Sequence, residues 1–314
     1  MTLRETGTYT HVMKVRRSGV VAIAYASALA APPAHTAAQT LQRSLYVSVV
    51  NEAGAPVPDL GPADFIVRED NVAREVLRVA PADEPMQVAV LVDTSQTSRN
   101  NISYMRTALP PFITALTNPN ESGRKNEVAL VAFGERPTIF TEYTTSTSEL
   151  QKGVNRIWSL PDAGAYLLDA LLEVCQGFKK REATRPVIVA IAVEGPELSY
   201  RHYDQVLGPL RDCAAPFYAL MIGTPSADLS DEGRSRSIVL DRGTTDTGGR
   251  RDQLLSGMAL NDRLKQLAAQ LTHQYRVTYA RPQSLIPPER VTVSTSRQGL
   301  TARGTPSKER QDRP

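Results

Sequence analysis

The sequence is poor in the side chains that most often carry catalysis or bind transition metals. Its 314 residues include two cysteines, four histidines and one tryptophan. Neither Cys175 nor Cys213 has a His, Cys or Asp partner at the spacing of a zinc site or a redox motif. No Ser/His/Asp or Cys/His set is visible either. In an exported protein the two thiols could form one disulfide, or they could remain two buried thiols, and their spacing does not decide between these.

The sequence also lacks an excess of charge of one sign. The formal net charge is +3, and residues 1–38 account for it with four basic groups and one acid. The remainder of the chain would be formally neutral. This balance argues against nucleic acid or an anionic membrane surface as the partner.

Long apolar runs are missing beyond the first 40 residues. The run VVAIAYASALAA at 20–31 follows a basic cluster that begins just after Met13, a second candidate start of the chain. Small residues then lead to a plausible cleavage site before Gln39. We therefore predict that residues 1–38 are a signal peptide and that the mature protein is periplasmic or extracellular. A buried N-terminal helix is the alternative, since the run is too short for a good membrane span.

Residues 39–84 read as a small β module. Turn-rich sequence separates three alternating stretches, at 44–50, 64–70 and 73–80. A module of this size is too small to be stable alone. We expect the short strands in 282–304 to pack on it or on the following sheet, and 305–314 to be a disordered tail.

Residues 85–281 predict a different architecture, in which buried strands alternate with amphipathic helices. The strands are expected at 86–92, 127–134, 137–143, 185–193, 216–223 and 275–280. The second and third lie too close together for a crossover helix and should pair antiparallel. The polar, Gly-rich residues 224–257 read as a long surface loop with one weak element around SIVL at 237–240. The predicted fold is a doubly wound, mostly parallel, Rossmann-like α/β sheet with one antiparallel edge strand.

Oxygen-bearing side chains follow the first strand of this sheet. Asp93, Ser95 and Thr97 stand at alternate positions after VAVLV, at the edge where such sheets bind ligands. Carboxylate and hydroxyl oxygens suit Mg²⁺ or Ca²⁺, and neutral hydroxyls leave the ion able to accept a carboxylate from a partner. The alternative is that Asp93 only caps the following turn or helix. Trp158, at the end of an amphipathic stretch, is predicted to be core.

At this point the sequence resembles a known family. VAVLVDTSQTS at 88–98 resembles the opening of a von Willebrand factor A domain, whose metal-ion-dependent adhesion site begins Asp-x-Ser-x-Ser. EVALVAFG, GAYLLDAL and VIVAIAVEGPELS resemble later segments of the family. The segment VVNEAGAPVPDLGPADFIVRED, together with TGGR and the stretch from 259, is similar to an exported bacterial subgroup of Acidobacteria type. That subgroup carries a β module before the A domain.

The departures from the family pattern concern the implied metal site. Ala165 stands where the family has a Thr ligand, and Glu194 stands where it has an Asp. The resemblance therefore implies a degenerate site, with Asp93, Ser95, Thr97 and Glu194 as candidate ligands. Mg²⁺ or Ca²⁺ would be held weakly or not at all, because Ala165 offers no oxygen. Glu194 could equally be a solvated carboxylate at a strand end.

These features predict an exported, non-enzymatic protein-binding module for adhesion or assembly. The docking face would comprise the Asp93 loop, residues 163–166 and residues 194–199, with a weak divalent cation bridging to an acidic side chain of the partner. One alternative is a metal-free structural component of an envelope assembly. Another is a haloacid-dehalogenase-like phosphatase with Asp93 as nucleophile, against which Ser95 stands where a second Asp is expected.

Overall fold

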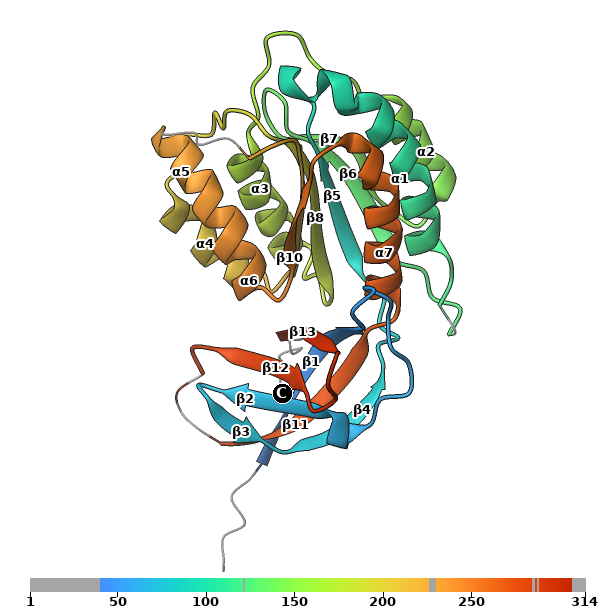
Figure 1. The fold of residues 1–314 in the computed structure, drawn as a ribbon, viewed down its shortest axis with the longest axis vertical. Helices are drawn as coiled ribbons and strands as arrows, with labels where there is room; N and C mark the ends of the chain where they lie inside the picture. Colours follow the sequence, from blue (N-terminus) through green and yellow to red (C-terminus); the bar gives the residue numbers. More distant parts are fainter. Residues whose placement is uncertain (1–39, 121, 226–229, 284–285, 287, 307–314) are drawn as a thin grey trace, which may run out of the picture. The chain divides into compact units, whose positions relative to one another are not determined.

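A six-stranded sheet is the centre of the α/β part of the chain (Figure 1). The computed structural model describes residues 40–306 except 121, 226–229, 284, 285 and 287. The sheet has the order β10-β9-β8-β5-β6-β7. Its strands are β5 (Gln87–Val92), β6 (Glu127–Ala132), β7 (Thr138–Thr144), β8 (Pro186–Val193), β9 (Phe217–Ile222) and β10 (Arg250–Leu254). All neighbours pair parallel except β7, which pairs antiparallel with β6 at the edge. The predicted fold class is confirmed.

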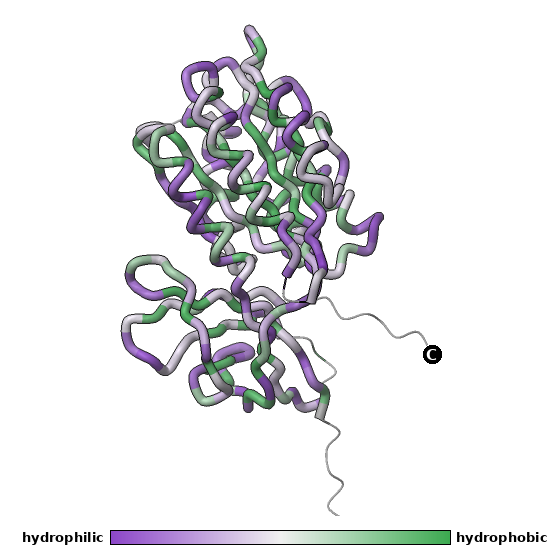
Figure 2. Tube along the Cα trace, turned by 90° about the vertical axis from the view of Figure 1, so that its right-hand side faces the viewer, coloured by the Kyte–Doolittle hydropathy of each residue, from purple (hydrophilic) through white to green (hydrophobic). Residues whose placement is uncertain are grey.

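Helices cover both faces of this sheet, and strand alternation explains why. Val88, Val90 and Val92 of β5 pack into one core cluster, while Ala89 and Leu91 pack into the other, as expected for a central strand buried on both faces. The first cluster lies under α1 (Ile102–Thr117), α2 (Thr147–Asn155) and α7 (Leu260–Thr272). The second lies under α3 (Leu167–Lys180) and α4 (Tyr203–Asp212). Figure 2 shows apolar residues concentrated along these strands.

The prediction of a loop at 224–257 with only one weak element, around 237–240, is wrong for most of its length. After the undescribed residues 226–229, the chain forms α5 (Asp231–Ile238), the π-helical turn η3 (Val239–Gly243), α6 (Thr244–Asp246) and β10. Ser230 caps α5 by accepting a hydrogen bond from the Gly233 N–H at 3.0 Å. The segment is too polar to show helical periodicity, and β10 is an edge strand in which only Leu254 is buried. Tertiary contacts therefore decide its structure.

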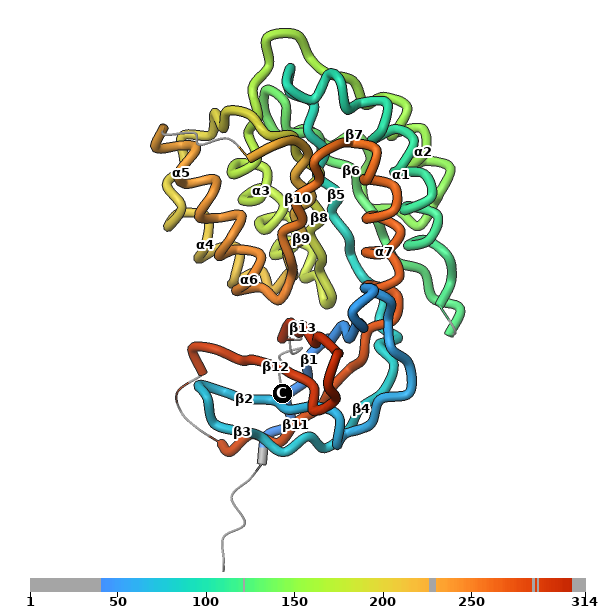
Figure 3. The backbone as a smooth tube through the Cα atoms, viewed as in Figure 1, coloured from blue at the N-terminus to red at the C-terminus, as the bar shows by residue number. Residues whose placement is uncertain are grey.

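Two antiparallel sheets form the β module. One has the order β13-β1-β11-β4 and the other β12-β2-β3. The strands are β1 (Thr40–Val50), β2 (Phe65–Glu69), β3 (Val72–Arg74), β4 (Val76–Pro81), β11 (Tyr275–Pro282), β12 (Val291–Thr295) and β13 (Thr301–Pro306). The third stretch predicted in this module is two strands, β3 and β4, which belong to different sheets. In Figure 3 the first and last described segments of the chain run side by side here.

The prediction that residues 275–280 form the last strand of the α/β sheet is also wrong. They belong to β11, which pairs antiparallel with β1 from Thr40↔Pro282 to Val47↔Tyr275. Burial along β11 alternates, as in an antiparallel strand with one covered face rather than a central parallel strand. The C-terminal strands join the module too, since β12 pairs with β2 and β13 with β1.

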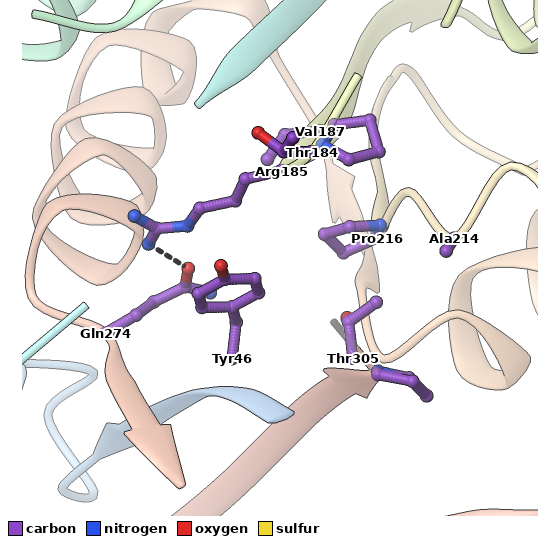
Figure 4. A pocket seen from close by; sticks show the side chains of 10 residues that line it. Tyr46, Thr184, Arg185, Val187, Ala214, Pro216, Gln274 and Thr305 are labelled. Atoms are coloured by element: carbon purple, nitrogen blue, oxygen red, sulfur yellow. Dashed lines mark hydrogen bonds between the residues drawn. The ribbon is translucent and has the colours of Figure 1, made fainter. Parts of the chain in front are cut away.

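A buried arginine connects the module to the amino ends of the parallel strands (Figure 4). Arg185, just before β8, donates to the carbonyl oxygens of Ala82 and Glu84 at 3.1 and 2.6 Å. Its other terminal nitrogen donates to Gln274 Oε1 at 2.6 Å, and the guanidinium lies 4.7 Å from the centre of the Tyr46 ring. The chain therefore has polar contacts from the sheet to both segments that enter or leave the module.

The predicted signal peptide at 1–38 lies outside the described residues. Within the described part, no helix combines the length and apolar character needed to cross a bilayer.

Candidate functional site

Three loops meet at the carboxyl edge of the parallel strands. The first follows β5, the second precedes α3, and the third follows β8. The Gln96 N–H donates to the Ala163 carbonyl at 2.9 Å, and the Leu198 N–H donates to the Ala165 carbonyl at 2.8 Å. Gly195 of the third loop approaches Thr97 of the first so closely that a Cβ on it would lie 2.9 Å from Thr97 Cγ2. The loops that the sequence selected as a docking face therefore lie together.

Asp93 is fully buried and joins two of these loops. Its Oδ1 accepts from the Ser95 N–H and its Oδ2 from the Val193 N–H, both at 2.9 Å. Burial raises the pKa of the Asp93 carboxyl, while these hydrogen bonds and the positive charge of Arg236 act in the opposite direction. The Oδ1 contact is the local turn that the capping alternative expected. The Oδ2 contact spans 100 residues and could not be read from the sequence.

The two predicted hydroxyl ligands face each other. Ser95 Oγ and Thr97 Oγ1 are 2.8 Å apart. Ser95 is buried and Thr97 is exposed at the surface. The Ser95 carbonyl accepts from the hydroxyls of Ser98 and Ser159 at 2.7 and 2.9 Å. These contacts hold the turn after β5 in one conformation and bring the predicted oxygens of this loop to one place.

Glu194, the fourth predicted ligand, is engaged elsewhere. Its Oε1 accepts from Gln253 Nε2 at 3.2 Å and lies 3.7 Å from Arg251 Nη2. Its Oε2 lies 3.9 Å from Arg236 Nη1. Only 12% of the Glu194 side chain is exposed, so it is a paired carboxylate rather than a solvated one. Ala165, the substituted Thr position, packs in the core beneath α3.

Arg236 is a central residue of this edge that sequence reasoning missed. It projects from α5 and is buried, with 5% exposure. Its Nη1 donates to the Gly195 carbonyl at 2.7 Å and its Nη2 to the Val193 carbonyl at 3.0 Å. Arg236 thus holds the start of the loop after β8. It sits in a polar stretch that offers no periodic signal, so no feature of the sequence could have found it.

Glu197 is the second missed residue. Its Oε1 accepts from the N–H groups of Ser199 and Leu168 at 3.3 and 3.4 Å, the latter at the start of α3. Its Oε2 lies 3.9 Å from Arg236 Nε. Burial raises the pKa of Glu197 to about 7, although the Ser199 hydroxyl and Arg236 favour the charged form. Glu197 therefore connects the third loop, helix α3 and helix α5.

Exposed apolar side chains surround these loops. Trp158 is 60% exposed, so the prediction that it is core is wrong. The reason is that α2 ends at Asn155, which leaves Trp158 in the loop that contacts Thr94 through the Leu160 N–H. The other large apolar residues exposed on loops at this edge are Leu198, Tyr200, Leu255 and Met258, at 40, 88, 79 and 74%. Such a concentration is typical of an interaction surface.

The side chains present do not fit a divalent cation. Across the described ranges, no group of three or more His, Cys, Asp or Glu side chains could hold a metal ion. Both Asp93 oxygens already accept backbone hydrogen bonds, and Glu194 faces two arginines. The positive charge of Arg236 also acts on Asp93. Only the Ser95 and Thr97 hydroxyls are arranged as the metal prediction requires.

Comparison with known proteins gives a family match for part of the chain. The model of the von Willebrand factor type A domain matches residues 88–193, about a third of the chain. No curated protein matches the sequence.

Solved structures resemble the chain at low identity. A von Willebrand factor type A protein from Catenulispora acidiphila has 12% identity and a TM-score of 0.48, covering 87% of this chain and 75% of its own. The vWF domain of the type V pili tip protein Mfa5 from Porphyromonas gingivalis has 9% identity and a TM-score of 0.45, covering 60% and 96%. Proximal thread matrix protein 1 from the mussel byssus, solved with a zinc-occupied MIDAS motif, has 13% identity and a TM-score of 0.47. It covers 68% of this chain, which spans half of that protein.

The exported subgroup suggested by the sequence is not tested by these comparisons and stays a prediction. The resemblance to a von Willebrand factor type A domain is confirmed for residues 88–193, which match the model of that family.

Proposed function

We propose that the chain is a protein-binding module that docks its partner on the carboxyl edge of the six-stranded sheet. The observation that carries this proposal is the set of exposed apolar side chains on the loops of that edge, Trp158, Leu198, Tyr200, Leu255 and Met258. Aromatic anchors of this kind dominate the energetics of protein interfaces. The von Willebrand factor type A match, a family of interaction modules, supports the same class of function.

Contacts among the loops of this edge hold them in position for docking. Leu198 packs on the backbone of the loop before α3, where a Cβ on Gly164 would lie 2.0 Å from Leu198 Cδ1. Arg236 holds the loop after β8, which carries Leu198, by donating to the Gly195 carbonyl, and Glu197 ties that loop to the start of α3 by accepting from the Leu168 N–H. A partner would meet preorganised loops, which lowers the entropy lost on binding.

An acidic side chain on the partner remains part of the proposal. The guanidinium that could meet it is Arg251, whose side chain is 25% exposed, whereas Arg236 keeps only 6%. We propose no bridging ion, because the donor set described above does not fit one. Pairing with Arg251 would compete with its present contacts to Glu194 and Asp241.

Export to the periplasm or the extracellular space belongs to the proposal as well. Its support is the basic and apolar pattern of residues 1–38. Sequencing the N-terminus of the protein recovered from the producing cells tests it. A mature chain that begins at Gln39 is expected, and an intact N-terminus in the cytoplasm would contradict export.

The phosphatase alternative requires Asp93 to attack a substrate. The Asp93 carboxylate is fully buried and both its oxygens accept backbone hydrogen bonds. A nucleophile needs an open approach to the reacting atom, and these contacts leave none. The other alternative, a metal-free structural component of an envelope assembly, stays open.

Site-specific photo-crosslinking tests the docking edge. A photoreactive residue at Tyr200 or Met258 should trap one partner in cells, while the same residue at Val72 on β3, which is 54% exposed, should not. With the trapped partner purified, Trp158→Ala should weaken binding by about tenfold or more. Ile139→Ala, at an exposed position of β7, serves as the matched control. Equal trapping from Val72 would refute this docking surface.

A further inference from the structure

A permanent positive charge is built into the carboxyl edge of the sheet. Arg236 comes from α5, a helix that lies far from β8 in sequence, and reaches the end of β8 and the loop that follows it. Its two terminal nitrogens donate to the carbonyls of Val193 and Gly195. Val193 is also the residue whose N–H donates to Asp93 Oδ2. One peptide segment therefore lies between the guanidinium and the buried carboxylate.

Two carboxylates lie beside this guanidinium, and its charge acts on a third. Glu194 Oε2 and Glu197 Oε2 each lie 3.9 Å from an Arg236 nitrogen, and the Arg236 charge acts on Asp93 through space. Buried carboxylates need a cation or hydrogen bonds to remain in a protein interior. In this site the guanidinium supplies that cation, and its planar fork at the same time fixes the loop after β8.

A divalent ion beside Asp93 would meet unfavourable conditions. The ion would stand near a buried guanidinium, and like charges repel strongly where water is excluded. One backbone donor already occupies each Asp93 oxygen, which leaves fewer lone pairs for an ion or its waters. Yet Ser95 and Thr97 still present converging hydroxyls 2.8 Å apart. Two of the side chains of a cation site are thus in place. The positive charge that an ion would bring to the nearby carboxylates is already supplied by Arg236.

We propose that Arg236 takes the place of the metal ion at this edge, so that the site is metal-independent and its loops are held by a resident guanidinium. This inference concerns how the site is built and does not depend on the identity of the partner. It predicts that loss of the Arg236 charge converts the site into one that gains from a divalent cation.

Titration of the full chain with Mn²⁺ and Mg²⁺ tests the proposal, by calorimetry and by the shift in melting temperature. The wild-type chain should give no heat and no shift. Arg236→Gln removes the charge and keeps one amide donor. It should melt at a lower temperature, bind Mn²⁺ at least about tenfold more tightly than wild type, and recover melting temperature on ion binding. Asp93→Asn in the Arg236→Gln background should abolish this gain.

The matched control is Arg236→Lys, which keeps the charge and should bind no ion. If Arg236→Gln fails to fold, Arg236→Gln with Glu197→Gln removes the buried pair together and replaces it in the same titrations. Ion binding by the wild-type chain that Asp93→Asn abolishes would overturn the proposal. A folded Arg236→Gln chain that gains no ion affinity would overturn it as well.

Discussion

At the residue scale, the buried carboxyl groups decide how the site responds to pH. Glu197 is held by N–H groups from Leu168 and Ser199 and faces Arg236. Burial nevertheless raises its pKa from 4.5 to about 7. The pKa of Asp93 is raised for the same reason. In both cases the folded protein binds the proton more tightly than the unfolded chain does.

We therefore predict that the free energy of unfolding falls as pH rises from 4.5 to 7 through the titration of Glu197. The stabilisation is fully present below the unfolded pKa and is lost as pH rises through the folded pKa. Glu197→Gln should remove this contribution, so its stability relative to wild type should increase by about 1–3 kcal/mol over that range. Urea unfolding at several pH values measures it, with the exposed Glu149→Gln as control. A constant difference between Glu197→Gln and wild type would contradict the prediction.

At the element scale, two helices on one face of the sheet are in position for a covalent link. Cys175 of α3 and Cys213 at the end of α4 are both buried, and their Sγ atoms are 2.8 Å apart. The sequence did not decide between a disulfide and two buried thiols, and tertiary packing brings the two sulfurs together. The helices are already in contact, so a link would need little backbone movement.

We predict that exchange with a small disulfide donor such as oxidised glutathione joins Cys175 to Cys213. Each donor disulfide is reduced to two thiols as the protein pair loses two hydrogens. The link closes a segment of 38 residues and should stabilise the fold by about 3–4 kcal/mol. Mass spectrometry under non-reducing conditions and melting with and without reductant measure it. Cys213→Ala should be insensitive to reductant, and an unchanged mass after exchange would reject the prediction.

The glycine pair before β10 shows how an element can depend on close backbone approach. A Cβ on Gly249 would lie 1.9 Å from the Phe217 carbonyl oxygen in the neighbouring strand β9. Gly249→Ala should therefore lower the free energy of unfolding by at least about 1–3 kcal/mol, because β9 and β10 must move apart to make room for the methyl group. Gly177→Ala within α3 meets nothing within 4 Å and should stabilise by about 0.5–1 kcal/mol. Denaturant midpoints compare the two, and equal midpoints would contradict this account.

At the scale of the whole molecule, Arg185 determines how the parallel sheet and the β module hold together. Its guanidinium satisfies Ala82 O, Glu84 O and Gln274 Oε1. Arg185→Ala should cost about 2–4 kcal/mol, because these acceptors lose their donors in a buried place. Lys125→Ala, at an exposed position, should change stability by less than about 0.5 kcal/mol. Melting temperature measures the loss of stability in Arg185→Ala. Faster hydrogen exchange throughout β11 would indicate that the module has loosened, whereas faster exchange confined to the residues around position 185 would indicate a local effect.

How much of the structure could be predicted from the sequence depends on how far apart in the chain the interacting residues lie. Strands such as β5 and β8 are buried on both faces, so continuous apolar runs identified them, and the fold class followed. The resemblance located the Asp93 loop because its residues are adjacent in sequence. Arg236 and β10 carry no such signal, since a polar edge strand and a buried arginine on a polar helix owe their positions to contacts with distant residues.

The sequence by itself determined the alternation of strand and helix, the antiparallel edge strand and the local turn at Asp93, because each depends on neighbouring residues and on burial period. Only the tertiary structure decided that β11 belongs to the module, that Trp158 is exposed and that a guanidinium lies beside the predicted cation site. The physical reason is that pairing partners and buried charges are fixed by long-range packing, which local pattern does not encode.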